Sequence, residues 1–355
     1  MSFRTRRVLF ITPLYMIFQY FLLKYLFLLF GGLNDSYLII IAVLLGLMHC
    51  GPVLFETKKS TIPGRFLSTI NGIWMWASVM FLIDILVIYV VGMFVSLPFE
   101  VIVLMIAIVP ILAIYNFYKA HKLVVNEKTI KLDNLSQEIN IAHLSDVHFG
   151  SVRYKEIIHK VADKLIELED TCDLAIISGD LADGSCVVNE NDFDYFKNVD
   201  MPIVFTPGNH DFYPGIDNVV QACKNADIIV LDNERMEFEN LSIYGLTFSF
   251  EDRESPKINK DVLNPNLTNI INYHVPYYWD EFSKLGFDIQ LSGHTHGGQF
   301  YPVVWFANLM FKYNKGLFKN KLGKYLHVTT GVGSMDTPMR WGTDSEIVIL
   351  KLRKS

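Results

Sequence analysis

The sequence predicts an α/β fold in which two β-sheets pack as a sandwich flanked by helices, preceded by a four-helix transmembrane region. Three observations predict it. Residues 1–122 contain four long apolar stretches, residues 123–355 alternate short apolar runs with an amphipathic helix pattern, and polar motifs follow several of those runs. The hydrophobic fraction of 51% is high for a soluble protein. We therefore expect a transmembrane anchor at 1–122 and a globular domain at 123–355.

The four apolar stretches also predict how the chain lies in a membrane. Each can cross a hydrocarbon core of roughly 30 Å as a helix; they are residues 8–30, 37–55, 73–96 and 99–118. Basic residues flank one side of this set, namely Arg4, Arg6, Arg7, Lys58, Lys59, Arg65, Lys119 and Lys122. By the positive-inside rule we expect a multi-pass protein of the cell (inner) membrane with residues 123–355 in the cytoplasm.

Two charged residues, Lys24 and Asp84, lie inside the apolar stretches. Charges at this depth are costly and often functional. We expect Lys24, near the outer end of its stretch, to reach toward the interface, and Asp84 to pair with it or to face the interior of the bundle. A small transporter with a regulatory domain is the alternative that these two residues favour.

Short apolar runs in residues 123–355 predict the strands of the sandwich. They occupy residues 129–132, 139–144, 174–177, 203–205, 228–231, 241–244, 270–273, 289–291, 326–329 and 346–352. Residues 154–169 predict a helix, because Ile157, Val161 and Leu165 recur on one face. This half of the chain has 22 basic and 33 acidic residues. That balance argues against nucleic acid as a partner, because nucleic-acid binding relies on cationic surface.

Seven side chains in five short motifs form a candidate metal centre. The motifs are Asp146-Val147-His148, Gly179-Asp180, Gly208-Asn209-His210-Asp211, His274 and Gly293-His294-Thr295-His296. If Asp146 and His148 continue a strand, they point to one face and can share a cation. A single carboxylate such as Asp180 can bridge two cations. We expect the glycines, with Gly150, to make sharp turns beside the crowded site.

The donor types of these motifs indicate which metals fit. Imidazole nitrogens and carboxylate or amide oxygens, without a thiolate, suit Mn²⁺, Fe²⁺ or Zn²⁺ better than Ca²⁺. Two such cations about 3.5–4 Å apart can clamp a phosphoryl group and activate water near neutral pH. The motifs therefore predict two divalent metal ions as cofactors and a phosphate-containing substrate.

In this order, the motifs DxH, GD, GNHD, H and GHTH resemble those of the calcineurin-like metallophosphoesterase superfamily. The resemblance covers roughly residues 139–352. Gly297-Gly298-Gln299, Gly331-Val332-Gly333 and Pro338-Met339-Arg340 look like a bacterial branch. That branch includes membrane-associated phosphodiesterases and relatives of UDP-diacylglucosamine pyrophosphatases. The four apolar stretches are not part of the superfamily pattern.

The resemblance implies a role for each motif residue. It implies one metal bound by Asp146, His148, Asp180 and His296, and a second bound by Asp180, Asn209, His274 and His294. It implies that His210 contacts a phosphate oxygen or protonates the leaving group, and that Asp211 orients the His210 ring. Arg340 is a candidate for binding a substrate phosphate oxygen. We treat His49, His143 and His327 as ordinary histidines.

Residues 300–325 combine aromatic residues with five lysines and no acidic residue. Such a composition suits a membrane surface, although a packed loop with a basic face is the simpler alternative. The predicted function is a dinuclear metal-dependent phosphohydrolase that cleaves a phosphodiester or pyrophosphate, plausibly of a lipid-linked substrate at the inner leaflet. A general or cyclic-nucleotide phosphodiesterase on soluble substrates, and a non-catalytic phosphate-binding membrane sensor, are the alternatives.

Overall fold

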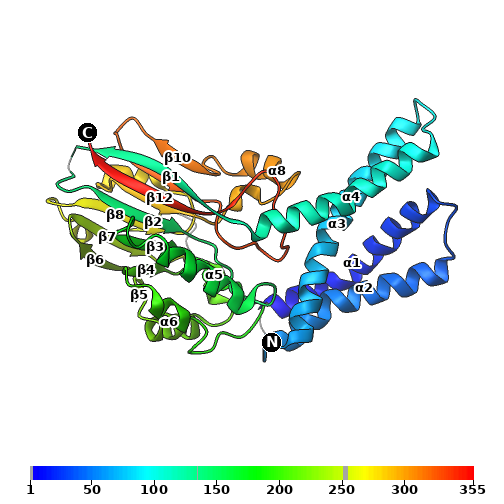
Figure 1. Cartoon of the computed structure of the whole chain (residues 1–355), viewed down its shortest axis with the longest axis horizontal. Helices are drawn as coiled ribbons and strands as arrows, with labels where there is room; N and C mark the ends of the chain where they lie inside the picture. The colour runs from blue at the N-terminus through cyan, green and yellow to red at the C-terminus, as the bar shows by residue number, and fades with distance from the viewer. Residues whose placement is uncertain (1–2, 134, 251–254) are drawn as a thin grey trace.

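Two layers of β-sheet and four long helices make up the protein (Figure 1). The computed structural model describes residues 3–133, 135–250 and 255–355. Four helices form the helical region: α1 (Phe3–Leu28), α2 (Asp35–Glu56), α3 (Ile62–Gly92) and α4 (Phe99–His121). The two sheets and the helices that cover them form the two-sheet region. All four are long and apolar enough to cross a membrane. This confirms the predicted combination of a two-sheet α/β fold with four preceding apolar helices.

The first sheet has the strand order β1-β12-β2-β3-β4-β5. Strands β2 to β5 run parallel, and β12 lies antiparallel to β2 and parallel to the edge strand β1. Helices α5 (Tyr154–Ile166) and α6 (Ile216–Asn225) pack on it. Its strands are β1 (Leu123–Leu132), β2 (Ile139–Leu144), β3 (Leu174–Ser178), β4 (Ile203–Thr206), β5 (Ile229–Val230) and β12 (Ser345–Lys354).

The second sheet has the order β10-β11-β9-β8-β7-β6, and α7 (Trp279–Leu285) packs against it. Its strands are β6 (Glu234–Phe238), β7 (Leu241–Leu246), β8 (Thr268–Tyr273), β9 (Ile289–Ser292), β10 (Gly316–Lys319) and β11 (Tyr325–Val328). Strands β6 and β10 and helices α6, α7 and α8 (Val303–Met310) were not predicted. Side chains such as Ile141, Val204 and Ile270 fill the space between the sheets. Because both faces of the first sheet are covered, its central strands are apolar throughout rather than alternating.

The helical region contacts the two-sheet region at one end. Figure 1 shows the α1–α2 and α3–α4 connections at the end remote from the sheets, and the start of α1 close to them. Lys24 forms an ion pair at 3.2 Å with Asp35, the first residue of α2, so it does not need Asp84 as a partner. Helix α3 begins at Ile62, well before the apolar stretch at 73–96, and its first turns lie against the two-sheet region.

Gly72 on α3 lets this helix pack closely against the two-sheet region. A Cβ atom added to Gly72 would lie 2.6 Å from the carbonyl oxygen of Asp336 and 2.8 Å from the ring of Pro338. Next to it, Trp76, Met80 and Met339 form a buried apolar cluster. Helix α3 is therefore packed against the loop 335–340 rather than loosely tethered to it.

We expect Gly72→Ala to destabilise the protein, because relief of such a clash requires a backbone shift that costs about 1–3 kcal/mol. Thermal unfolding of the full chain in detergent measures this. Gly51→Ala in α2 is the matched control, since its added Cβ would meet nothing within 4 Å. A Tm for Gly72→Ala equal to that of Gly51→Ala would contradict the tight contact.

Candidate metal centre

The predicted metal ligands follow strands of both sheets at one edge of the sandwich. Five of the seven come within three residues of the end of a strand, namely Asp146 after β2, Asp180 after β3, Asn209 after β4, His274 after β8 and His294 after β9. His148 and His296 come four residues after the ends of β2 and β9. Because these strands are parallel within each sheet, their carboxyl ends open on the same side. Residues far apart in the sequence are thereby brought together.

The backbone at this edge is unusual. Five of the seven ligand candidates have a positive φ, between 49° and 71°: Asp146, His148, Asp180, His294 and His296. This region is uncommon for residues other than glycine and costs of order 1–3 kcal/mol each. Neighbouring loops fix it through hydrogen bonds, for example from Asp146 N to Gly179 O at 3.0 Å and from His148 N to Asp180 O at 3.0 Å. Asp146 and His148 thus share a site on a turn and not, as expected, along a strand.

Most of the motif glycines are needed because a side chain would clash with a neighbouring carboxylate, not because the chain turns there. Of the four expected at turns, Gly179 has a positive φ of 81°, whereas Gly150, Gly208 and Gly293 do not. A Cβ at Gly208 would lie 2.4 Å from Asp180 Oδ1, and one at Gly293 would lie 2.3 Å from Asp146 Oδ2. These glycines therefore leave room for the two carboxylates.

One group of donors surrounds Asp146. Its Oδ1 lies 3.3 Å from His296 Nε2, 3.7 Å from His148 Nε2 and 4.0 Å from His274 Nε2, and is buried without a hydrogen-bond donor. The Nε2 atoms of His148 and His296 are only 3.0 Å apart. Two lone pairs at this distance need a proton or a cation between them, so the arrangement fits a divalent metal.

A second group surrounds Asp180. Its Oδ2 lies 3.0 Å from His274 Nε2 and 4.0 Å from His148 Nε2, so this carboxylate faces both groups. His294 Nδ1 lies 3.3 Å from His274 Nε2 and 3.0 Å from Asn209 Oδ1. The other oxygen of Asp180 accepts a hydrogen bond from His210 N at 2.8 Å, which fixes the carboxylate between the two groups.

The electrostatics of the site favour cations. Burial lowers the pKa of His294 to about 4 and that of His296 to about 3, which leaves neutral imidazoles with a free lone pair. For His274, burial opposes the charged form, but Asp180 and Asp146 outweigh it and raise its pKa to about 9. The negative charge of Asp180 and Asp146, which keeps a proton on the buried His274 ring, also attracts a metal ion. Metal binding then releases that proton.

His210 lies next to this centre, at the wall of an open cavity. Its ring meets that of His148 edge-on, with centroids 4.9 Å apart, and its Nδ1 lies 3.3 Å from the carbonyl oxygen of Asp183. Asp211 does not orient this ring, contrary to expectation. Its buried carboxylate instead accepts hydrogen bonds at 2.8–2.9 Å from three backbone N–H groups, those of Asp180, Ala182 and Gly208. Asp211 therefore joins two of the ligand-bearing loops.

Arg340 also has an environment different from the one expected. Its side chain is fully buried, and its guanidinium donates to the carbonyl oxygens of Thr330, Gly331, Gly333 and Asp344 and to Thr343 Oγ1. With its donors directed at these backbone acceptors, Arg340 holds the loop that follows β11. The expected contact with a substrate phosphate is not supported, because the guanidinium has no access to the cavity.

The sequence interpretation missed the polar residues behind the ligands. His143 lies between the sheets, with its Nδ1 2.7 Å from His327 Nδ1 and its Nε2 2.7 Å from Ser178 Oγ. The carbonyl oxygen of Ser178 lies 2.7 Å from His274 Nδ1, which directs Nε2 of that ring at the metal centre. A serine directly before Gly179-Asp180, at the end of an apolar strand, was the available signal.

Curated proteins with similar sequences carry related descriptions. An uncharacterized metallophosphoesterase of Helicobacter pylori is 28% identical over 243 residues, 64% of this chain and 63% of that protein. The uncharacterized protein YpbG of Bacillus subtilis is 31% identical over 192 residues, 50% of this chain and 70% of its own length. A "transmembrane protein with metallophosphoesterase domain" of Danio rerio is 26% identical over 276 residues, 71% of this chain and 63% of that protein. The chain thus spans less than two thirds of the first of these relatives.

The match to a protein family falls on the residues that form the site. Residues 139–298 match the sequence model described as calcineurin-like phosphoesterase. This range begins at β2 and ends just after the GHTH motif, so it contains all seven ligand candidates and His210. The segment of the chain that carries the site therefore matches the calcineurin-like phosphoesterases.

Proposed function

We propose that the protein is a phosphohydrolase that uses two divalent cations, Mn²⁺, Fe²⁺ or Zn²⁺, to cleave a phosphodiester or pyrophosphate. The observation that carries the proposal is the position of Asp180, whose carboxylate faces both groups of donors. Asp146, His148, Asp180 and His296 bind one cation, and Asp180, Asn209, His274 and His294 bind the other. When bound, such a pair polarises a phosphoryl oxygen and activates water.

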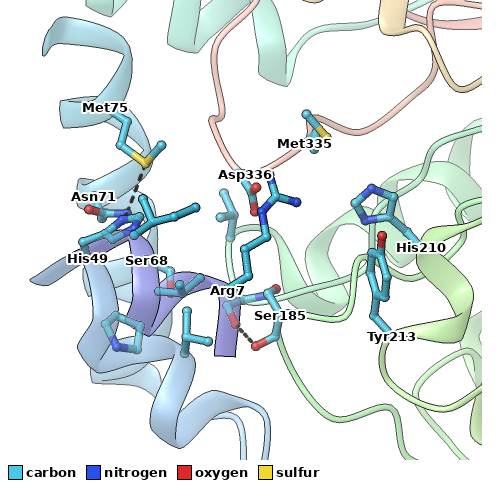
Figure 2. A pocket seen from close by; sticks show the side chains of 16 residues that line it. Arg7, His49, Ser68, Asn71, Met75, Ser185, His210, Tyr213, Met335 and Asp336 are labelled. Carbon is cyan, nitrogen blue, oxygen red and sulfur yellow. Dashed lines mark hydrogen bonds between the residues drawn. The ribbon is translucent and has the colours of Figure 1, made fainter. Parts of the chain in front are cut away.

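His210 is the proposed catalytic residue that is not a ligand. Its backbone N–H fixes Asp180, while its ring projects toward the cavity (Figure 2). With Nδ1 near the Asp183 carbonyl oxygen, Nε2 is the atom that contacts a phosphate oxygen or donates a proton to the leaving group. Asp211 acts only through the loops that it joins.

We further propose that residues 1–122 anchor the protein in the cell (inner) membrane and that residues 123–355 lie in the cytoplasm. The flanking basic residues support this orientation, and the Danio rerio relative is named a transmembrane protein. The start of α1 and the end of α2 lie near the two-sheet region (Figure 1). The metal centre therefore faces the membrane surface.

Helix α8 supports a lipid-linked substrate. Its Trp305, Phe306, Leu309 and Met310 are 60–84% exposed, whereas Val304 and Ala307 are buried. It begins seven residues after His296 and presents this apolar face to the outside. An exposed face of this kind suits the interface of the inner leaflet.

The rest of the stretch 300–325 supports the alternative of a packed loop with a basic face. Tyr313 and Phe318 pack against Trp279 and the buried Leu326 and Val328. Several lysines already have contacts within the protein: Lys312 with Asp280 at 3.5 Å, Lys324 with Asp288 at 2.5 Å and Lys315 with Gly342 O at 2.9 Å. The membrane-facing part of our proposal is therefore confined to α8.

A lipid-linked phosphodiester or pyrophosphate is the substrate class that we favour, as in the bacterial branch with UDP-diacylglucosamine pyrophosphatase relatives. The runner-up is a general or cyclic-nucleotide phosphodiesterase acting on soluble substrates. A phosphate-binding sensor without turnover is disfavoured, because each ligand candidate and His210 lie within one site.

Removal of individual site residues separates metal binding from turnover. We expect about two metal ions per wild-type chain. Asp180→Asn should bind fewer, because the shared carboxylate becomes a neutral amide. His210→Ala should bind as many as the wild type. Hydrolysis of bis(p-nitrophenyl) phosphate by His210→Ala should have a kcat about 100- to 10,000-fold lower. Elemental analysis and steady-state kinetics measure the two effects.

The control is His159→Ala, which removes an exposed histidine that stacks on Tyr195 far from the ligands. Its metal content and kcat should equal those of the wild type. Two bound ions combined with full activity in Asp180→Asn would refute the dinuclear centre. Wild-type protein loaded with Mn²⁺ that hydrolyses none of a phosphomonoester, a phosphodiester and a pyrophosphate would refute the hydrolase.

The proposed membrane face of α8 predicts a substrate-dependent loss. The double replacement Trp305→Ser with Phe306→Ser should lower turnover of a phosphodiester lipid in vesicles, because it removes apolar contact area, and should leave hydrolysis of a soluble aryl phosphodiester unchanged. Leu322→Ser is the control, since Leu322 is 58% exposed in the β10–β11 turn, at the end of the sheet opposite the metal centre. Equal losses on both substrates would contradict the membrane role of α8.

A further inference from the structure

The end of the helical region encloses a cavity of about 300 Å³ together with His210 and loops beside the metal centre, although none of the seven ligand candidates lines it. One wall carries His210 and Tyr213, the opposite wall is made by α1, α2 and α3, and Ser185 lies beside Arg7 (Figure 2). A residue proposed to contact the substrate phosphate and three apolar helices thus line the same space.

Each of the three helices contributes one face to this cavity. The lining positions are Arg7, Val8 and Ile11 on α1, His49, Pro52 and Val53 on α2, and Ser68, Asn71 and Met75 on α3. Within each helix these positions are separated by one, three, four or seven residues, which places them on one side. Three independent helices therefore turn a consistent face toward His210.

If the helices span the membrane as proposed, the cavity lies at the depth of the lipid head groups. Its lining residues on α1 and α3 lie at or just before the start of apolar stretches, and those on α2 lie at the end of one. These are the ends flanked by basic residues, where the polar and apolar layers of a membrane meet. A ligand in the cavity would contact the cytoplasmic boundary of the bilayer and His210 at once.

The lining chemistry is amphipathic. Val8, Ile11, Pro52, Val53 and Met75 offer apolar surface on the helical side. On the polar side, Arg7 extends into the gap between the helices and His210, and Asp336 lies beside it (Figure 2). A guanidinium binds phosphate oxygens, whereas a carboxylate accepts hydrogen bonds from hydroxyl groups.

We infer that this cavity is the substrate pocket and that α1, α2 and α3 form the half of it that recognises an amphiphilic phosphoester. The ligand class is a phosphodiester or pyrophosphate that joins an apolar chain to a hydroxyl-bearing head group. Arg7 binds a phosphate oxygen next to the one at His210, Asp336 accepts from the head group, and the chain leaves along Val8, Ile11 and Val53. This inference rests on the proposed hydrolase function and gives the helices a role beyond anchoring.

Recognition by Arg7 is tested with two probes on the full chain in detergent micelles with Mn²⁺. The probes are CDP-dioleoylglycerol, which has the amphiphilic character, and bis(p-nitrophenyl) phosphate, which lacks it. Arg7→Gln should raise the KM for the lipid probe by about 10- to 100-fold, since it loses a charge-assisted hydrogen bond. Its kcat/KM for the small probe should fall by a smaller factor, because bis(p-nitrophenyl) phosphate has a single phosphate and no apolar chain to be held beside Arg7.

The neighbouring Arg6 supplies the matched control. Arg6→Gln makes the same change in charge one residue away, on an exposed side chain outside the cavity lining, and should leave both probes unaffected. A general effect of N-terminal charge on membrane insertion would appear in both variants. If Arg7→Gln and Arg6→Gln behave alike on the lipid probe, Arg7 has no part in recognition and the inference fails.

A space-filling variant tests the apolar half. Val53→Trp should block the lipid probe and spare the small one, whereas Val43→Trp, the same change at an exposed position of α2 outside the cavity, should affect neither. Photocrosslinking with a diazirine-bearing phosphatidyl lipid gives a readout without turnover, with labels expected on α1–α3 near Ile11 and Val53 and lost in Val53→Trp. If neither probe is hydrolysed but the labelling is intact, the hydrolase function is refuted and the pocket is not. If the probes are hydrolysed but α1–α3 are not labelled, the pocket is refuted.

Discussion

The crowding of carboxylates and imidazoles around Asp146 and Asp180 is the constraint on which the two-sheet region depends. Imidazole nitrogens that face one another at 3.0–3.3 Å, and a buried carboxylate oxygen without a donor, are costly to leave unneutralised. The loops that impose this arrangement adopt strained conformations, and the glycines beside them leave no spare volume. The sandwich supplies the rigidity that such strain requires, because it anchors each ligand loop directly to a buried strand.

Much of the fold followed from local patterns. Apolar runs located ten of the twelve strands, because each lies between polar turns. Strand β6 is largely exposed and β10 is half-buried, and neither has a distinctive apolar run. Helices α6 and α7 were missed because they are short. The ligand candidates could be identified from the sequence because metal binding requires a small set of residue types, here His, Asp and Asn. Arg340 and Asp211 could not be interpreted correctly from the sequence, since their partners are backbone groups whose positions depend on the finished fold.

The cavity beside His210 was likewise invisible in the sequence. Its residues lie on three helices and several loops, and apart from His210 none of them belongs to a motif. In the sequence, Arg7 served only as one of the basic residues that predict how the helices are oriented in a membrane. The contact between α3 and the loop 335–340 gives Arg7 a second environment, because it brings the ends of the helices that are flanked by basic residues to the ligand-bearing edge of the sheets.

The order of strands in the first sheet has a consequence for biosynthesis. Strand β1 follows α4 almost immediately, but its neighbour in the sheet is β12, which also separates it from β2. While the ribosome is still making the intervening polypeptide, β1 has no partner and β2 has an open edge. The helices can enter the bilayer early, yet hydrolytic competence must wait until translation has passed residue 354. An enzyme assembled in this order becomes active only after its four long helices have been synthesised.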